Sequence, residues 1–360
     1  MLPGYLDTPE LASFAARRPF ARPTTLRRSF APPILAPLAP HVSTTASPLP
    51  HSWWQTAVGL WRLGRYRFLA GGFVLYALGA ALARATHALD PARYALGQAI
   101  ITATQLMTHY SNDYFDLEAD AANPTPTRWS GGSRVLPDGG VSPALARNVA
   151  LGCGAVAGIL ACVLAWRGLT SPGTLIILVV AIVLSWEYSA PPLRLHSRGL
   201  GPLTAAIVVG GLTPLAGYGV QGGRWLPAIL ASMLPVVIAQ FALVLILDFP
   251  DAVGDSRTGK RTLVVMLGRE RAIVIALLAI ALTYVSLPIL VGMGGGPLLA
   301  LGVACTLPIG AWLAWTLRSG SWRNGGPMKT LAFAGVLWFV AVSLAELVAV
   351  LVAPYLRWPT

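Results

Sequence analysis

Long apolar stretches recur along this chain, and this repetition limits the folds that it can adopt. An α-helix needs roughly 20 apolar residues to cross the hydrocarbon core of a bilayer. Only 11% of the 360 residues are charged, whereas a soluble domain usually carries about 25%. We therefore predict an all-α, polytopic membrane protein of about nine transmembrane helices, near 68–86, 94–110, 149–166, 173–188, 203–220, 227–247, 272–292, 297–317 and 330–353.

The distribution of positive charge predicts the orientation of these helices. Of the 26 Lys and Arg residues, 21 lie in the N-terminal segment or in the loops after the second, fourth, sixth and eighth helices. Because positively charged loops favour the cytoplasmic side of a membrane, we expect the N-terminus and these loops to face the cytoplasm or the equivalent side of an organelle membrane. The net charge of +12 is then a topology signal and an attraction for anionic lipid, not a sign of nucleic-acid binding.

Residues 1–55 differ in composition from the rest of the chain. They are rich in Pro, Ala, Arg, Ser and Thr and lack helical periodicity, so we expect a disordered basic segment. An organelle transit peptide and a basic tail are both open interpretations. Residues 56–360 are expected to form one transmembrane domain. Its cysteines lie in apolar runs without CxxC spacing, so we expect neither a disulfide nor a zinc site from Cys153, Cys162 and Cys305.

Two acidic clusters with identical spacing follow the second and the sixth apolar runs. They are Asp113, Asp116 and Asp120 in 111-SNDYFDLEAD-120, and Asp248, Asp251 and Asp255 in 248-DFPDAVGD-255. Offsets of three and four place side chains on one face of a helix, and such close like charges repel unless cations lie among them. Pro250 disfavours helical geometry at Phe249, so we expect a helix start or a kink there. Four predicted helices separate the clusters, which suggests two related halves with a site between them.

The chemistry of these clusters favours a hard cation and a phosphorylated substrate. Carboxylates without sulfur ligands indicate Mg²⁺, which usually combines one or two carboxylates with substrate phosphate oxygens. Basic side chains can neutralise the remaining phosphate oxygens, although loop arginines also act as plain topology signals. The expected metal ligands are Asn112, Asp113, Asp116, Asp120, Asp248, Asp251 and Asp255, of which Asp113, Asp116, Asp251 and Asp255 are expected to be catalytic, and the expected diphosphate ligands are Arg128, Arg134, Arg194, Arg257, Lys260 and Arg261.

Three motifs together resemble those of one family. The motifs NDYFDLEAD, YSAPPLRL and DAVGDSRTGKRTL follow the second, fourth and sixth apolar runs, as in the UbiA superfamily of intramembrane prenyltransferases, and the resemblance covers about residues 60–353. The first motif fits the family pattern NDxxDxxxD in full, and the second fits DxxxD at Asp251 and Asp255. The resemblance implies a helical bundle around a central cavity, two Mg²⁺ ions that bind a polyprenyl diphosphate, and transfer of the prenyl group to an acceptor.

The implied reaction produces an allylic cation that must be kept from water. An apolar interior shields such a cation, and aromatic faces stabilise it. The segment 188-YSAPPLRL-195 is expected to be a short extended connection that caps the cavity, and Glu187 is an interface acid or an acceptor-side base. Polar roles are expected for His109 and His196, and a hydrogen-bond partner for Glu346. The expected cavity residues are Tyr114, Tyr188 and Phe241, with Tyr110, Phe115 and Trp186 as further candidates.

The acceptor is open within the family. Residues 131–139 and 254–268 look more like the branch that prenylates 1,4-dihydroxy-2-naphthoate in menaquinone biosynthesis, whereas YSAPPLRL resembles the chlorophyll and tocopherol branches. We expect an aromatic acceptor of the naphthoate type. The alternatives are 4-hydroxybenzoate, homogentisate, chlorophyllide and a glycerol phosphate lipid. A membrane transporter is the alternative of another class, but transporter acids normally lie within the spans, whereas these lie at span ends on one predicted side.

Overall fold

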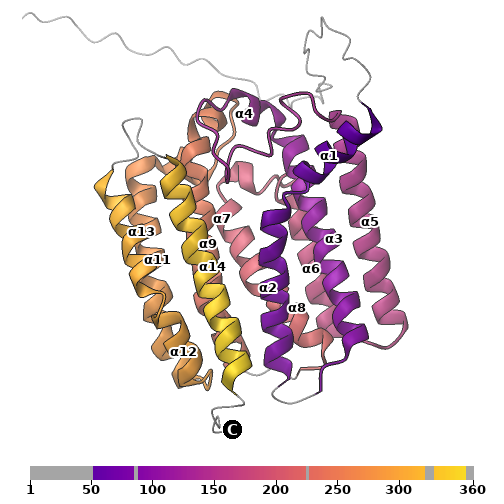
Figure 1. The fold of residues 1–360 in the computed structure, drawn as a ribbon, viewed down its shortest axis with the longest axis vertical. Helices are drawn as coiled ribbons and strands as arrows, with labels where there is room; N and C mark the ends of the chain where they lie inside the picture. The colour runs from indigo at the N-terminus through magenta and orange to yellow at the C-terminus, as the bar shows by residue number, and fades with distance from the viewer. Residues whose placement is uncertain (1–51, 85–87, 224–226, 321–327, 354–360) are drawn as a thin grey trace, which may run out of the picture. The chain divides into compact units, whose positions relative to one another are not determined.

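A computed structural model describes residues 52–84, 88–223, 227–320 and 328–353, and in these residues it contains helices and no strands. The expected disordered segment lies outside this part of the chain, apart from its last residues, which already belong to a helix. The helices are α1 (Trp53–Leu63), α2 (Tyr66–Ala83), α3 (Pro91–Phe115), α4 (Leu117–Ala122), α5 (Pro143–Trp166), α6 (Pro172–Glu187), η1 (His196–Arg198), α7 (Gly201–Ala205), η2 (Ala206–Leu212), α8 (Thr213–Val220), α9 (Pro227–Arg257), α10 (Leu263–Leu267), α11 (Arg269–Gly292), α12 (Pro297–Ala304), α13 (Leu307–Ser319) and α14 (Met328–Val352) (Figure 1).

Each of the nine apolar runs forms one helix or a broken helix, which confirms the all-α class. The run 203–220 is divided into α7, the π-helical turn η2 and α8, and the run 297–317 into α12 and α13, which meet at a bend of 42°. By length and composition, six helices of the described residues can cross a membrane, or seven if α12 and α13 count as one span. Helix α6 has 16 residues, and α3 carries buried polar side chains such as Gln98 and Thr104. The number nine therefore stays a prediction.

Several long helices begin with the same sequence signature, a short polar residue followed by proline. The polar side chain accepts hydrogen bonds from the first free backbone N–H groups of the helix, and proline fits the first helical position because no N–H is needed there. Proline therefore fixes the start of each helix without weakening it. The pairs are Asp90 and Pro91 at α3, Ser142 and Pro143 at α5, and Ser171 and Pro172 at α6.

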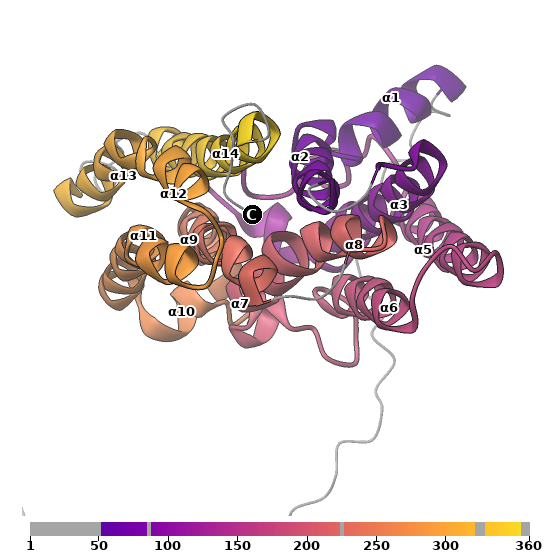
Figure 2. The same ribbon diagram turned by 90° about the horizontal axis from the view of Figure 1, so that it is seen from below.

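Helix packing brings two distant parts of the chain to one end of this helical domain. Helix α3 packs along α5, α2 along α8, and α9 against α11 and α14 (Figure 2). The C-terminal ends of α3 and α9 lie at the same end, where α4 contacts α9 (Figure 1). This contact is close at Gly254, where a Cβ atom would lie 2.7 Å from the backbone oxygen of Ala119. The glycine in DAVGD thus lets α4 and α9 meet, and both acidic clusters sit at this junction.

Two expectations about the local geometry of the clusters are wrong. Helix α3 ends at Phe115, and Asp116 is its C-cap, so the first cluster continues onto the separate helix α4 instead of forming one stripe. In contrast, α9 runs without interruption through Pro250, so all three acids of the second cluster lie on one helix. The Pro250 carbonyl accepts a hydrogen bond of 2.9 Å from the Thr125 hydroxyl. Tertiary contacts therefore support the helix where the local proline rule predicted a start or a kink.

Candidate active site

Side chains from both acidic clusters meet through shared polar contacts. Lys260 Nζ lies 2.8 Å from Asp116 Oδ2 and 3.5 Å from Asp255 Oδ1, so one ammonium group joins the end of α3 to the end of α9. Asn123, just after α4, donates a hydrogen bond of 2.8 Å to Asp251 Oδ1. The structure thus brings the two clusters face to face, as expected from their equal spacing.

Asp113 is enclosed by donors from two other segments. It is 1% exposed and forms an ion pair with Arg65, while the backbone N–H and the hydroxyl of Ser133 both donate to its second oxygen. Arg65 also donates to Asn112 at 3.3 Å. Burial lowers the pKa of Arg65, but the Asp113 and Asp120 carboxylates raise it above its ordinary value. The guanidinium therefore stays charged as a fixed cation of the site.

Lys260 and Asp116 form a buried ion pair at the centre of the site. Their side chains are 9% and 6% exposed. Burial lowers the pKa of Lys260, but Asp116 and Asp255 raise it well above its usual range. Burial likewise raises the pKa of Asp116, but Lys260 and then His196 hold it below its ordinary value. Both groups are thus charged at neutral pH, and each is the main reason why the other can be charged while buried.

His196 links the turn after α6 to the second cluster. Its Nε2 lies 3.0 Å from Asp248 Oδ1, and its ring stacks on Tyr188 at 4.8 Å between centroids and 25° between planes. Asp248 is 3% exposed, so this contact supplies a partner to a buried carboxylate. The predicted cavity residue Tyr188 therefore lies beside the acidic clusters, and it is placed there by a histidine expected to have a polar role.

The connection 188-YSAPPLRL-195 is compact, so the expected extended conformation is wrong. Its backbone forms turns in which the His196 N–H donates to the Tyr188 carbonyl and the Leu195 N–H donates to the Glu187 carbonyl, each at 2.9 Å. The side chain of Glu187 accepts from the Leu193 N–H at 2.9 Å. Glu187 thus holds the turn together, in agreement with an interface role rather than that of an acceptor-side base.

Replacing His196 with Ala is expected to lower kcat/KM for the prenyl diphosphate by roughly ten- to a hundredfold. The change removes a hydrogen bond to a buried carboxylate, worth about 1.5–3 kcal/mol, and the aromatic face against Tyr188. His196→Asn retains a donor for Asp248 and should recover part of the loss. Steady-state kinetics of the three proteins test this, and equal activity of the Ala variant and the unchanged protein would contradict it.

The segment 128-RWSGGSR-134 contributes backbone donors that only glycine allows. Gly131 and Gly132 have φ of 78° and 71°, a conformation that other residues rarely adopt. The Gly131 N–H donates to Asp251 Oδ2 at 3.0 Å, and Gly132 packs directly against the Asp120 carboxylate. Burial, with Asp113 and Asp116 nearby, raises the pKa of Asp120 to about 8. Without a bound cation, this carboxyl therefore tends to keep its proton at neutral pH.

The residues present fit a magnesium ion. The Oδ2 atoms of Asp248 and Asp255 are buried without a hydrogen-bond partner, which is costly for a carboxylate unless a cation binds it. Within the described ranges, no three His, Cys, Asp or Glu side chains are gathered closely enough to hold a metal. Arg65 and Lys260 pair with the Asp113 and Asp116 carboxylates. Metal binding by the predicted ligands therefore stays a prediction and would require some of these donors to exchange.

The predicted diphosphate ligands fall into three groups. Lys260 and Arg194 line a pocket of about 260 Å³ next to Asp116, together with Arg198 and Ser197. The side chain of Arg134 donates to the backbone oxygen of Asp120 and lies 3.8 Å from Asp138. The remaining three are exposed, and they are Arg128, whose guanidinium lies over the Trp129 ring, Arg257 and Arg261.

The other predicted aromatic residues lie in packing contacts. Tyr114 lies edge-on to Phe115 at 4.9 Å, and Phe115 lies edge-on to Trp186 at 6.0 Å. Phe241 packs against the hydrophobic core around α9. A role for Tyr114 and Phe241 in the substrate cavity stays a prediction. The fully buried Glu346 of α14 has no hydrogen-bond partner on either oxygen among the described residues, so the expected partner is wrong.

Sequence reasoning missed the residues that hold the acidic side chains in place. Arg65 and Asn123 contact acids that lie 48 and 128 positions away, and Ser133 lies 20 positions from Asp113. No local spacing connects such pairs. The one available signal was the order of the motifs, because RWSGGSR follows the first cluster directly and its two glycines indicate a turn close to that cluster.

Comparison with known proteins identifies the family. Residues 73–334 match the model of the UbiA prenyltransferase family. The chain belongs to this family. It is therefore a prenyltransferase, and its apolar helices make it an integral, multi-pass membrane protein.

Two curated relatives are named for different products. A digeranylgeranylglyceryl phosphate synthase of Methanopyrus kandleri is 33% identical over 245 residues, which are 66% of this chain and 80% of the relative. The chloroplastic chlorophyll synthase of Arabidopsis thaliana is 31% identical over 207 residues, which are 56% of this chain and 51% of that protein. The similarity therefore extends to more than one branch of the family.

Solved structures of UbiA homologues share this fold. A homologue from Aeropyrum pernix K1 superimposes with a TM-score of 0.59 at 18% identity, over 80% of this chain and 98% of the other. A homologue from Archaeoglobus fulgidus bound to DMAPP and Mg²⁺ gives a TM-score of 0.54 at 15% identity, also over 80% and 98% of the two chains. At these identities the structures support the fold alone.

Proposed function

We propose that this UbiA-family prenyltransferase uses Mg²⁺ and a polyprenyl diphosphate to prenylate an anionic, membrane-soluble acceptor. The main support is the meeting of two acidic clusters around Lys260 at one end of the helices. The Archaeoglobus fulgidus homologue bound to DMAPP and Mg²⁺ supports the same pairing of substrate and metal. The positive-inside rule supports a cytoplasmic or equivalent location for this end.

The protein's main chemical contribution is to hold charge and to exclude water. Asp113, Asp116, Asp251 and Asp255 would hold Mg²⁺, which as a Lewis acid neutralises charge on the diphosphate. Lys260 is fixed between carboxylates and can stabilise the departing diphosphate, an electrostatic form of catalysis that needs no movement of the charge. Apolar helices below the site keep water from the allylic cation. The residues that carry charge and the residues that exclude water thus belong to separate layers.

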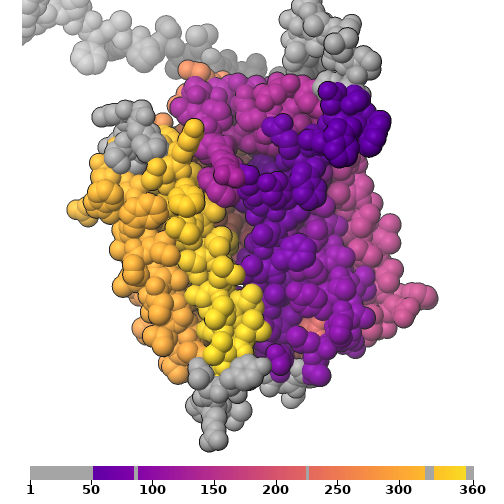
Figure 3. All heavy atoms as spheres, in the orientation of Figure 1, coloured from indigo at the N-terminus to yellow at the C-terminus, as the bar shows by residue number. Residues whose placement is uncertain are grey.

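The prenyl chain needs a route into the lipid. Figure 3 shows a hollow between α14, drawn in yellow, and α2, drawn in indigo, beneath the segment that follows α4. These two helices are in contact with each other. A narrow opening at this position supports a lateral path for the apolar chain while the diphosphate stays at the acidic end.

The pocket beside Asp116 favours an acceptor with negative charge. Three cations, Arg194, Arg198 and Lys260, line it beside two acids, Asp116 and Glu118. Arginine binds phosphate and carboxylate through paired hydrogen bonds. Ser197, which also lines it, has a buried hydroxyl without a partner. The Methanopyrus kandleri relative is named for a doubly prenylated glyceryl phosphate product, so a singly prenylated glyceryl phosphate is our first candidate for the acceptor. Dihydroxynaphthoate, whose carboxylate suits the same pocket, is the second and comes from the sequence motifs alone.

A parallel assay of acceptors is expected to give most product with geranylgeranylglyceryl phosphate. Purified protein receives Mg²⁺ and labelled geranylgeranyl diphosphate with that acceptor, with the same molecule lacking its phosphate, or with dihydroxynaphthoate, 4-hydroxybenzoate, homogentisate or chlorophyllide. Removal of the phosphate should lower product at least tenfold, because one hydrogen bond to a charged group is worth about 1.5–3 kcal/mol.

A matched pair of arginine variants locates the acceptor. Arg198→Ala should raise KM for the phosphate acceptor roughly tenfold with little effect on KM for the prenyl diphosphate. Arg167→Ala, at the exposed C-terminal end of α5, should leave both unchanged. Product from dihydroxynaphthoate alone would replace the first candidate by the second. Failure to release diphosphate with any acceptor would contradict the proposed reaction itself.

A further inference from the structure

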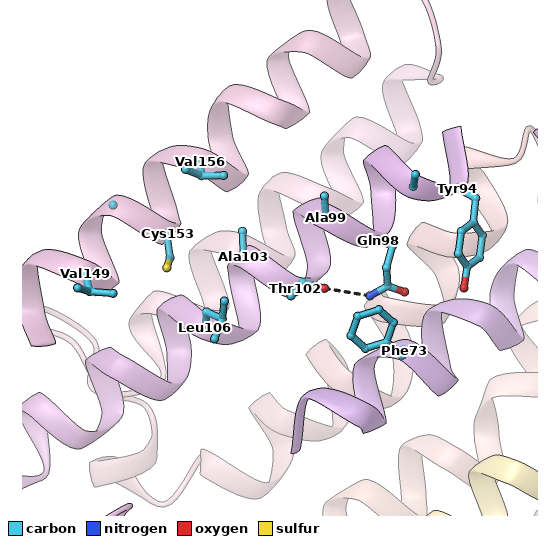
Figure 4. Close-up of a pocket in the computed structure, with 12 residues that line it drawn as sticks. Phe73, Tyr94, Gln98, Ala99, Thr102, Ala103, Leu106, Val149, Cys153 and Val156 are labelled. Carbon is cyan, nitrogen blue, oxygen red and sulfur yellow. Dashed lines mark hydrogen bonds between the residues drawn. The ribbon is translucent and has the colours of Figure 1, made fainter. Parts of the chain in front are cut away.

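A groove away from the acidic clusters runs along α2, α3 and α5 (Figure 4). Its volume is about 820 Å³. Small side chains of α3 form its floor, including Ala95, Ala99 and Ala103, while Phe73 and Val156, each 48% exposed, stand at its edges. None of the predicted catalytic residues lines it. Because its edges are exposed and apolar on membrane-spanning helices, the groove faces the lipid.

The groove is elongated and lies beside α2 and α5, which are long and apolar enough to cross a membrane. Its lining residues on α3 extend from Tyr94 to Leu106, which is roughly 18 Å along a helix axis at 1.5 Å per residue. Gln98 lies seven positions after Pro91, the first residue of α3, about 10 Å from the helix start. A long, narrow hollow at this depth matches an apolar chain rather than a globular partner.

The side-chain amide oxygen of Gln98, a residue that lines the groove, accepts no hydrogen bond from the described residues. Gln98 is 6% exposed, and its amide Nε2 donates to the Thr102 hydroxyl at 3.2 Å. Its amide oxygen is buried without any partner. An unsatisfied acceptor at this depth is costly, and Figure 4 shows the side chain among the labelled residues of the groove, at the end where Tyr94 lies. An occupant with a hydrogen-bond donor at that end would satisfy it.

We propose that this groove binds a neutral lipid alcohol whose hydroxyl group donates to the Gln98 amide oxygen. Its apolar chain would lie over Ala99 and Ala103 toward Leu106. A phospholipid head group is too polar for this depth, and a pure hydrocarbon leaves Gln98 unsatisfied. The inference concerns a second lipid site and stands whether or not the proposed acceptor is right.

Photo-crosslinking tests the proposal with the intact protein in nanodiscs. A long-chain alcohol that carries a diazirine should label α3 and α5 peptides in a saturable manner. Excess geranylgeraniol should reduce this labelling at least fivefold, whereas its methyl ether, which has no donor, should not. Prenyl diphosphate with Mg²⁺ should leave the labelling unchanged, which separates the groove from the catalytic site.

Two variants of α3 provide the matched comparison. Gln98→Leu should reduce labelling at least fivefold. Gln105→Leu should not, because Gln105 lies on the same helix, also has an unpartnered amide oxygen, and packs against Gly72 outside the groove. Ala99→Phe keeps Gln98 and places a bulky ring on the groove floor, so it should also abolish labelling. This variant tests the proposal if Gln98→Leu does not fold.

Three outcomes would overturn the proposal. The first is equal competition by the methyl ether, and the second is unsaturable labelling spread over all lipid-facing helices. The third is a disulfide between the Cys153 residues of two copies, because Cys153 lines the groove and such a bond would show that a second copy covers it. Cys162, nine positions further along α5 and exposed, lies on the opposite side of the helix and serves as the control for random contact.

Discussion

The substitutions Asp116→Asn and Asp251→Asn should each lower the rate of prenyl transfer at least about a hundredfold. A loss of this size is usual when one group that stabilises the charge of a transition state is removed. Asp116→Asn removes the charge that Lys260 contacts at 2.8 Å, and Asp251→Asn removes the charge of a carboxylate held by Asn123 and Gly131. Asn keeps the shape of the side chain and one acceptor oxygen, although Asp251→Asn gives up one of two accepted hydrogen bonds. The loss therefore reports on charge and metal binding rather than on packing.

The measurement is diphosphate release as a function of Mg²⁺ concentration. Both variants should need more Mg²⁺ for half-maximal rate if the missing carboxylate is a metal ligand. Asp138→Asn is the control, because Asp138 is an acid at the same end, with a side chain that is 61% exposed and 3.8 Å from Arg134. Near-normal turnover in Asp116→Asn would overturn the assignment of the first cluster.

The positions of the helices and of the acids could be predicted because both depend on local sequence. A membrane span requires a long apolar run, so the length of a run such as 330–353 gives α14 within a few residues. Asp248, Asp251 and Asp255 lie on one helix, as their three-and-four spacing predicts, although the same spacing in the first cluster is divided between α3 and α4. These features depend on neighbouring residues alone.

The contacts that organise the site depend on residues far apart in the chain. Nothing in GRYRF shows that Arg65 pairs with Asp113, since the pair forms only when α2 and α3 pack side by side. The expected helix start at Pro250 was wrong for a related reason. A local rule considers the missing N–H of proline, whereas α9 is supported by α4, α11 and the Thr125 hydroxyl. Tertiary packing therefore decides the details that local rules predict least well.

Lys260→Met should remove most activity and also destabilise the protein. The chain has two lysines, Lys260 and Lys329, and only Lys260 is buried between acids, with its ammonium group 2.8 Å from Asp116 and 3.5 Å from Asp255. Methionine has a similar length but no charge, so two carboxylates would lose their shared cation. Removing one partner of a buried ion pair costs about 3–5 kcal/mol, which predicts a lower thermal midpoint without Mg²⁺.

Added Mg²⁺ distinguishes a structural from a catalytic role for this lysine. If the carboxylates of Asp116 and Asp255 belong to the metal site, Mg²⁺ should bind them and recover part of the lost stability of Lys260→Met, because a ligand that binds only the folded state stabilises it. Activity should stay low, since the departing diphosphate would still lack the ammonium group. Lys329→Met, at the exposed start of α14, should change neither property. Recovery of both stability and turnover by Mg²⁺ would mean that Lys260 only separates the acids, and the role proposed for it at the diphosphate would be wrong.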